Sequence, residues 1–274
     1  MPELPEVETV KRELAKKVTG CTIAHTKIYL VKTIQKPDPE SFVKCIQNSR
    51  INSVKRRGKY LLFYLSNHLC LAAHLKMTGH FSVCGQGSAL HKHTRVVFSL
   101  DNGCDLRFVD TRTFGVMYLL CQKEMDQFKP LACLGPEPLS DAFTAQYLFE
   151  TGHQRTLPIK AFLLNQSFAC GLGNIYVDES LFRAGILPDR RTNTLSKDEW
   201  AALTLTIKEV LQEGIQHRGT SIQSYTSTDG RPGGYQDRLL VYGKDQRPCV
   251  RCGTPIQKQK TAGRGTHFCP TCQR

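Results

Sequence analysis

The sequence lacks long apolar runs and is short of acidic side chains. No stretch approaches the ~20 apolar residues of a membrane-spanning helix. The acidic N-terminus also has none of the features of a secretory signal peptide. These absences predict a soluble, cytoplasmic protein without a membrane partner. The chain has 24 acidic residues against 37 Lys and Arg, a formal net charge of +13, and this excess favours nucleic acid or another anionic surface as partner.

The sequence has no internal repeat or low-complexity tract, and its 274 residues are enough for one large or two ordinary domains. An apolar stripe at helical spacing runs from about Glu3 to Val18 and ends before Gly20. A helical pattern recurs at Pro39–Gln47. Short β-rich runs otherwise follow, at Thr22–Val31, Tyr60–Leu65, Leu69–Leu75, Thr94–Leu100 and Leu106–Val109. Such a series predicts an antiparallel sandwich or barrel.

The second half of the chain has a helical pattern. Leu131–Ser140 contains two prolines and a glycine and is interpreted as a linker. Thr220–Gln236 is polar and Gly-rich, which indicates a loop, and Leu239–Tyr242 is strand-like. Helices are predicted at Asp141–Glu150 with Ser140 as N-cap, at Ile159–Asn165, at Ile175–Ala184, and at Ser196–His217 with a capping box of Ser196 and Glu199. The predicted fold class is therefore α+β, with a β-sandwich followed by a helical region.

The twelve cysteines fall into two groups. Four of them, Cys249-x2-Cys252-x16-Cys269-x2-Cys272, have the spacing of thiolates around one tetrahedral zinc on a β-hairpin, with a redox pair as the alternative. Four sulfur ligands close the site, so its predicted role is structural. The other eight are scattered, mostly in apolar runs, and are interpreted as small buried hydrophobes.

The first eight residues combine two prolines with three acids. Methionine aminopeptidases remove Met1 before a small residue, which would leave Pro2 as a secondary amine. Proline and acids are favoured in the first turn of a helix, whose positive end makes such an amine a better nucleophile. Glu3 and Glu6 share a helix face and suit proton donors or orienters. The alternative is an ordinary acidic start of a surface helix.

Other motifs each have a functional and a structural interpretation. The glycines of Gly171–Tyr176 lead into a helix that suits a phosphate, with Asn174 as cap, or form a plain helix–helix turn. The cluster Lys55–Lys59 projects a lysine into a cleft or protects a sheet edge. Turns at 74–79 and 110–115 carry residues for insertion into DNA or for core packing. Gly263-Arg264-Gly265, at the expected hairpin tip, suits a groove or a phosphate.

Taken together and in this order, these motifs resemble the formamidopyrimidine-DNA glycosylase family, bacterial enzymes that excise 8-oxoguanine and ring-opened purines. The resemblance runs nearly end to end, through the N-terminus at 2–8, the hinge at 134–139, the helix–two-turn–helix at 171–176 and the zinc finger at 249–272. It implies a catalytic β-sandwich domain at 1–133, a hinge at 134–140, a helical DNA-binding domain at 141–243 and a zinc finger at 244–274.

The resemblance also implies residue roles in a bifunctional glycosylase/AP lyase of base excision repair. Pro2 attacks C1′ of the damaged nucleotide, Glu3 is the general acid, and Glu6 supports the site; Lys59 and Arg264 complete the catalytic set. The Schiff base on Pro2 permits β- and then δ-elimination. The implied DNA-binding residues are His74, Met77, His93, Arg112, Phe114, Arg155, Asn174, Tyr176 and Lys258. The implied lesion-capping loop is Thr220, Ser221, Ile222, Gln223, Ser224 and Tyr225.

The implied cofactor is one structural Zn²⁺, with no small-molecule cofactor. The implied partner is duplex DNA that contains an oxidised purine or an abasic site, bound by a monomer in the bacterial cytoplasm. Two positions depart from the commoner family pattern: Arg218 stands where many members have glycine, and Lys76 where glycine is frequent. Both changes add positive charge.

Three competing hypotheses remain. The sister endonuclease VIII type prefers oxidised pyrimidines, but it usually carries Gly and Ile-Arg where this chain has Leu4 and Val7-Glu8. A non-catalytic zinc-ribbon nucleic-acid-binding protein explains the charge and the cysteines but not the Pro-Glu terminus. A redox or metal-storage protein explains little beyond the cysteines.

Overall fold

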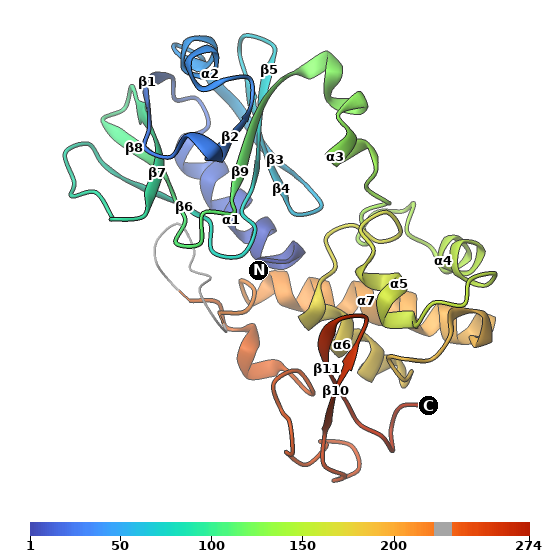
Figure 1. Cartoon of the computed structure of the whole chain (residues 1–274). Helices are drawn as coiled ribbons and strands as arrows, with labels where there is room; N and C mark the ends of the chain where they lie inside the picture. Colours follow the sequence, from blue (N-terminus) through green and yellow to red (C-terminus); the bar gives the residue numbers. More distant parts are fainter. Residues whose placement is uncertain (222–231) are drawn as a thin grey trace. The chain divides into compact units, whose positions relative to one another are not determined.

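The computed structural model describes residues 1–221 and 232–274 (Figure 1). It separates into an N-terminal unit, residues 1–132 and 217–234, and a C-terminal unit, residues 133–216 and 235–274. Four residues of the expected loop, Ile222, Gln223, Ser224 and Tyr225, lie outside the described residues. The division predicted at 133, 140 and 243 stays a prediction. Within the described ranges, no helix has the length and apolar character needed to cross a membrane.

The N-terminal unit begins with helix α1 (Leu4–Val18), as the sequence predicts. Glu3 is its N-cap, and Glu3 and Glu6 form a reciprocal capping box, with a proline in the first turn. The apolar stripe is buried along the whole helix, at Leu4, Val7, Val10, Leu14 and Val18. Burial of this stripe sets the direction of α1 and thereby places the N-cap.

Two sheets follow α1. One has the order β1 (Ile23–Ile28), β7 (Thr94–Leu100), β8 (Cys104–Val109), β6 (His80–Gly85), with antiparallel pairs throughout. The other has the order β2 (Ile34–Lys36), β9 (Val116–Cys121), β5 (Leu69–His74), β4 (Tyr60–Leu65), β3 (Ile51–Arg57). In the second sheet the pairs are antiparallel except β2 with β9. The connecting helices are η1 (Val31–Thr33), α2 (Pro39–Ile46), η2 (Gln122–Gln127) and α3 (Lys129–Ala132).

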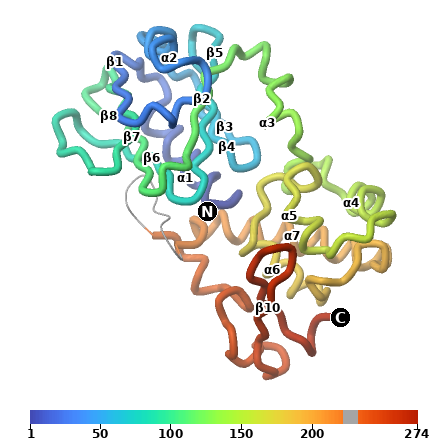
Figure 2. The backbone as a smooth tube through the Cα atoms, viewed as in Figure 1, coloured from blue at the N-terminus to red at the C-terminus, as the bar shows by residue number. Residues whose placement is uncertain are grey.

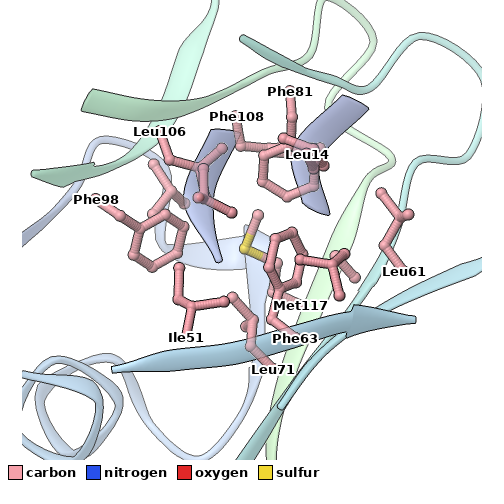
Figure 3. Close-up of a cluster of buried hydrophobic side chains, with 14 of the residues drawn as sticks. Leu14, Ile51, Leu61, Phe63, Leu71, Phe81, Phe98, Leu106, Phe108 and Met117 are labelled. Carbon is pink, nitrogen blue, oxygen red and sulfur yellow. The ribbon is translucent and has the colours of Figure 1, made fainter. Parts of the chain in front are cut away.

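The main hydrophobic core of this unit contains side chains from α1 and from both sheets (Figure 3). Phe81 of β6 links the sheets, because its ring centroid lies 5.4 Å from that of Phe63 on β4 and 5.2 Å from that of Phe108 on β8. Leu14 of α1 belongs to the same cluster. The predicted antiparallel sandwich is confirmed, with α1 as part of its core.

The C-terminal unit is helical and ends in a hairpin. Its elements are α4 (Ala145–Gly152), α5 (Ile159–Leu164), α6 (Asn174–Ala184), η3 (Thr192–Thr194), α7 (Lys197–Gln216), η4 (Tyr235–Arg238), β10 (Gln257–Thr261) and β11 (Arg264–Phe268). The predicted capping box of α7 is present, since Ser196 N–H donates to Glu199 Oε2 at 2.8 Å and Glu199 N–H donates to Ser196 Oγ at 3.2 Å. The hairpin of β10 and β11 lies beside α6 (Figures 1 and 2).

Three local predictions for this unit are wrong. Helix α4 begins later than expected, because Thr144 is the cap that accepts from Tyr147 N–H, whereas Ser140 donates its hydroxyl to the Glu137 carbonyl. Gly173, not Asn174, is the N-cap of α6. Residues 239–242 form no strand. The N–H groups of 240–242 donate to the Glu179 carboxylate and not to the backbone of a neighbouring strand.

Candidate active site and nucleic-acid interface

The amino terminus is a buried polar site at the start of α1. Pro2 is buried, and Glu3 and Glu6 are 4% and 2% exposed. Glu3 N–H donates to Glu6 Oε2 at 2.8 Å. On the other oxygen, Glu6 Oε1 accepts from Thr220 N–H at 2.7 Å and from the Thr220 hydroxyl at 3.1 Å. Glu6 therefore joins the N-cap to a segment more than 200 residues away in sequence, which the spacing of two acids does not reveal.

The electrostatic surroundings of the terminus suit an amine nucleophile. Burial lowers the pKa of the α-amino group at Met1, Glu3 and Glu6 oppose this shift, and Lys59 and Arg112 add to it. A lower pKa keeps a larger fraction of an amine unprotonated at neutral pH. The structure thus brings Glu3, Glu6, Lys59 and Arg112 into range of one amino group.

Lys59 lies in the turn between β3 and β4 and is 6% exposed. The turn is held by Arg56, whose guanidinium donates to the Gly58 carbonyl at 2.9 Å and to the Glu8 carboxylate at 3.0 Å. Glu8 also accepts from Lys11 at 2.9 Å and Arg12 at 2.8 Å; burial alone would raise the pKa of Glu8, but these three partners hold it lowered. Glu8 and Arg56 are positioning residues that sequence reasoning missed, although Arg56 lies in the basic cluster that it identified.

The residues expected to enter DNA sit on two turns joined by one buried carboxylate. Asp110, 1% exposed, accepts from the Thr78 hydroxyl at 2.5 Å, from Arg112 N–H at 3.2 Å and from Gly115 N–H at 2.7 Å. Thr78 Oγ1 in turn accepts from Arg112 N–H at 3.0 Å. Asp110 and Thr78 therefore fix the turn of Met77 against the turn of Arg112 and Phe114, a link that the sequence did not predict.

The residues expected to enter DNA differ in their exposure to solvent. Phe114 is 51% exposed, and the Arg112 guanidinium carbon lies 5.1 Å from its ring centroid. Met77 is half-buried. A Cβ on Gly115 would meet the Phe108 ring at 2.4 Å, so glycine is required where this turn crosses the core. An exposed aromatic ring held by an arginine on a rigid turn is a group that can enter a base stack.

His74 ends β5 and is 9% exposed. Burial, with contributions from Lys76 and Lys59, lowers the pKa of His74 to about 3, so its ring is neutral at physiological pH. Its Nδ1 accepts Lys76 N–H at 3.0 Å, which leaves Nε2–H as a donor. Lys76 has φ +53°, which explains on backbone grounds why glycine suits its position. His93 is half-buried, with its Nδ1 at 3.1 Å from Arg95 Nη2.

In the C-terminal unit, side chains of helices α5 and α6 bind the hairpin next to its turn. The Gly265 carbonyl accepts from Asn174 Nδ2 at 2.8 Å and from Lys160 Nζ at 3.2 Å. Lys160 is paired at 2.5 Å with Asp178, and both side chains are fully buried. The turn itself is Ala262-Gly263, with φ of +52° and +73°, so Arg264 begins β11 beside the tip, not at it. Arg264 is exposed, and the Asn174 amide helps to fix its neighbour.

The other residues expected to contact DNA differ in their exposure and their neighbours. Arg155 and Lys258 are exposed, and the Arg155 guanidinium carbon lies 4.7 Å from the Phe168 ring centroid. Tyr176 is fully buried and its ring stacks on Tyr235 at 5.5 Å. A contact from Tyr176 to DNA would therefore use its backbone in the first turn of α6.

The four cysteines with metal spacing come together, and their Sγ atoms all lie within 4.8 Å of one another. Sulfur atoms about 2.3 Å from a tetrahedral zinc are separated by roughly 3.8 Å. The Cys249–Cys272 and Cys252–Cys269 Sγ distances are 3.8 and 3.5 Å. The donor set therefore fits one structural zinc.

The interpretation of the other eight cysteines as buried hydrophobes is mostly wrong. Cys70 and Cys170 are buried, and burial raises the pKa of the Cys70 thiol to about 12. Cys45 and Cys133 are exposed. The remaining four are half-buried, at 21, 84, 104 and 121. Of these four, Cys84, Cys104 and Cys121 lie at or next to the ends of β6, β8 and β9.

Comparison with known proteins gives three consecutive family matches. Residues 1–117 match the formamidopyrimidine-DNA glycosylase N-terminal domain, residues 134–226 its H2TH domain, and residues 247–274 the zinc finger found in FPG and IleRS. Proteins named formamidopyrimidine-DNA glycosylase from Pelotomaculum thermopropionicum and Geobacillus kaustophilus are each 44% identical, over 100% of this chain and 99% and 100% of their own length.

Solved structures of Lactococcus lactis FPG are also similar to this chain. A mutant of that protein bound to Fapy-dG-containing DNA has a TM-score of 0.95 at 37% identity, with full coverage of both chains. A complex with DNA containing an abasic site has a TM-score of 0.94 at 37% identity, with 99% of each chain covered. A wild-type complex holds DNA with an oxidised pyrimidine, at a TM-score of 0.93, 37% identity and full coverage of both chains.

Proposed function

Because this chain belongs to the formamidopyrimidine-DNA glycosylase family, we propose that it is a bifunctional DNA glycosylase and AP lyase that repairs oxidised purines. The observation that carries the proposal is the polar site at the amino terminus. There Glu3, Glu6 and Lys59 interact electrostatically with the terminal amino group, which belongs to Met1 before processing, and burial lowers the pKa of that group. A binding module has no use for such an amine, whereas imine chemistry requires it.

The proposed reaction requires removal of Met1, after which Pro2 supplies a secondary amine. The Pro2 nitrogen attacks C1′, the C1′–N9 bond breaks, and the base leaves with the proton that the nitrogen loses. Glu3 protonates the sugar ring oxygen, so that the ring opens and the nitrogen forms an iminium with C1′. Loss of a C2′ proton expels the 3′ phosphate, and a second elimination expels the 5′ phosphate. Lys59 stands beside this centre as an electrostatic partner.

The proposed binding mode follows from the need to extrude the base, which costs a few kcal/mol. Phe114 and Met77 fill the vacated space, and Arg112 engages the orphaned cytosine. His74 is proposed to donate Nε2–H to a phosphate, because its Nδ1 already accepts an N–H. Exposed basic residues of both units, with Asn174, are proposed to hold the backbone, which predicts affinity that falls steeply with salt.

The substrate class is proposed to be oxidised purines and abasic sites in duplex DNA. The Lactococcus lactis relative has been solved in complex with Fapy-dG, abasic and oxidised-pyrimidine DNA, so a protein of this kind binds DNA with lesions of either base class. Leu4 and Val7-Glu8 favour the purine branch over the endonuclease VIII branch. The zinc is proposed to be structural and not catalytic, in a finger that binds DNA and supplies Arg264 to the catalytic set. The enzyme is proposed to act as a monomer.

Borohydride trapping tests the proposal. The protein without Met1 is incubated with a duplex carrying one 8-oxoguanine opposite cytosine, reduced, digested and analysed by mass spectrometry. We expect a covalent adduct on Pro2. Pro2→Gly, which supplies a primary amine with a different nucleophilicity, and a protein with a blocked N-terminus should lose most or all of the adduct. Pro5→Ala is the matched control in the same turn and should keep it.

The result that would overturn the proposal is DNA binding without any adduct from a protein whose Met1 is shown to be absent. That outcome favours the non-catalytic zinc-ribbon protein. A Pro2 adduct formed faster on an oxidised pyrimidine than on 8-oxoguanine would instead move the enzyme to the endonuclease VIII type of substrate.

A further inference from the structure

Residues 217–221 and 232–234, here called the stem, are two segments of the N-terminal unit that hydrogen-bond to each other. Gly234 N–H donates to the His217 carbonyl at 2.8 Å, and Gly233 N–H donates to Ser221 Oγ at 2.8 Å. Two consecutive stem residues, Arg218 and Gly219, have left-handed backbone, with φ of +62° and +76°. The stem is therefore a tight, specifically bent element.

Two carboxylates of α1 hold the stem. Glu6 accepts both Thr220 donors, at 2.7 and 3.1 Å. Glu13 accepts a hydrogen bond from the Arg218 guanidinium, and the two form an ion pair. The Glu13 side chain is 15% exposed and the Arg218 side chain 41% exposed. Glu6 and Glu13 are seven residues apart, which is close to two helical turns, so both point from one face of α1.

The packing of the stem explains which positions carry a side chain. A Cβ on Gly219 would lie 2.5 Å from Glu6 Oε1, and one on Gly233 would lie 2.2 Å from the Gly219 carbonyl. Glycine is thus required at both positions. Arg218 has the same left-handed backbone but carries a long side chain, although non-glycine residues adopt this conformation at a cost. Contacts of the Arg218 side chain, which glycine lacks, can offset this conformational cost.

We propose that Arg218 and Glu13 are a positioning pair that sets Thr220 against Glu6 and, through Glu6, the backbone of Glu3. The inference rests on the proposed function and adds a residue to it. Arg218 touches no reacting atom in this role. It acts through the chain Arg218–Glu13, Thr220–Glu6 and Glu6–Glu3, each link of which is a contact of the structure.

The alternative role for Arg218 is a direct contact with a DNA phosphate, and one pair of variants separates the two. Arg218→Gly removes the guanidinium and relieves the left-handed backbone, and Glu13→Ala removes the pair but keeps the cation. A positioning pair predicts that both variants lower the single-turnover excision rate, by about threefold to fivefold as for a partly exposed ion pair. It also predicts a DNA dissociation constant within about twofold of wild type in both.

A phosphate contact predicts the opposite pattern. Arg218→Gly would weaken DNA binding, and Glu13→Ala would leave binding unchanged or strengthen it because the cation is released. That pattern overturns the inference. So does an excision rate that is unchanged in both variants.

The charge-swapped pair gives a second test that misfolding cannot imitate. Arg218→Glu should lower the excision rate further, since two carboxylates then face each other, and Glu13→Arg combined with Arg218→Glu should recover most of it. Failure of the double variant to recover, with the melting temperature unchanged, refutes the pair. Lys16→Gln is the matched control, because it removes one cation from α1 at an exposed side chain.

The wild-type protein distinguishes this inference from the proposed function. If wild type forms no Pro2 adduct and excises no base, the proposed function has failed. If wild type excises 8-oxoguanine and the variants match it, the enzyme assignment stands and the positioning pair is wrong.

Discussion

The β-sandwich and the zinc-finger region both hold side chains of the candidate site, but they do so on different frames. The sandwich has a large apolar core from α1 and both sheets. The zinc-finger region has a small cluster of Phe182, Val241, Ile256 and two of the zinc-binding cysteines. Buried apolar area is the main source of folding free energy. We therefore expect the sandwich to stay folded without its polar contacts and the zinc-finger region to depend on them.

Polar groups consequently have different roles in the two regions. In the sandwich, Asp110, Glu6 and Glu8 orient turns and termini that an apolar core already supports. In the zinc-finger region, consecutive buried acids of α6 form the support itself. Asp178 binds Lys160 and His267 N–H, and Glu179 accepts three N–H groups of residues 240–242. Burial raises the pKa of Glu179, and these three donors oppose the rise.

Zinc removal should produce the largest difference in stability between the two regions. Structural zinc contributes about 10 kcal/mol or more to the folding of small finger domains, so Cys269→Ser should release zinc and unfold residues 247–274 while the sandwich stays folded. Zinc content, limited proteolysis and DNA affinity measure this. Cys133→Ser, at an exposed thiol outside the zinc set, should change none of them. An empty site with wild-type proteolysis and affinity would contradict the dependence on metal.

Truncation of the buried ion pair is the next largest effect. Lys160→Ala leaves the fully buried Asp178 carboxylate without its cation, which should lower the free energy of unfolding by about 3–5 kcal/mol. Urea denaturation measures the change. Lys160→Met with Asp178→Leu removes both charges and should recover much of the loss. A single variant as stable as wild type would show that the pair is not the support inferred here.

In the sandwich, loss of a polar organiser should cost less stability. Asp110→Asn weakens a buried acceptor of three donors and should lower the free energy of unfolding by about 1–3 kcal/mol. It is also expected to loosen selection for cytosine opposite the lesion, as is Arg112→Ala, because Asp110 holds the Arg112 turn. Excision rates with each of the four bases opposite 8-oxoguanine test this; an unaltered preference would reject the link between Asp110 and Arg112.

The smallest predicted effect is a pH dependence in the sandwich. The pKa of His74 is about 3 in the folded protein and near 6.5 in the unfolded chain. Because the folded pKa is depressed, the unfolded state takes up the proton first, so this contribution is complete above about pH 6.5 and declines toward about pH 3. At about pH 5.5 the loss is about 1 kcal/mol.

His74→Gln should therefore lose less stability than wild type between about pH 7 and about pH 5.5 in chemical denaturation. His68 carries no such burial and lies in an exposed turn, so His68→Gln is the control and should follow wild type. Parallel pH profiles for His74→Gln and wild type would show that His74 does not cause the decline.

Local sequence chemistry predicted much of this fold. The apolar stripe and the Pro-Glu start of α1 act within a few residues, and the predicted helix begins one residue from the observed one. Tyr60–Leu65 and Thr94–Leu100 are strands with the predicted bounds. The two Cys-x2-Cys pairs bring their sulfurs together as their spacing predicts. Each of these signals is local, or depends on a ligand with a fixed geometry.

The errors arose where a distant partner replaced a local one. Residues 239–242 are strand-like in composition, but Glu179 satisfies their N–H groups. Asn174 is a good capping residue, yet its amide donates to Gly265, 91 residues away. Arg218 stood out in the sequence only as added charge, whereas its partner is Glu13. Sequence separation conceals such pairs because each residue alone has an ordinary local interpretation.

By itself, then, the sequence determined the α+β class, the helix that presents the amino terminus, the zinc ligands and the resemblance that the family matches confirm. Only the tertiary structure decided which carboxylate holds which turn: Glu6 with Thr220, Asp110 with Thr78 and Arg112, and Asp178 with Lys160. The physical reason is range. Propensity, capping and metal spacing act over a few residues or through a fixed ligand geometry, whereas a buried polar group binds whatever donor the packing of the apolar core brings beside it.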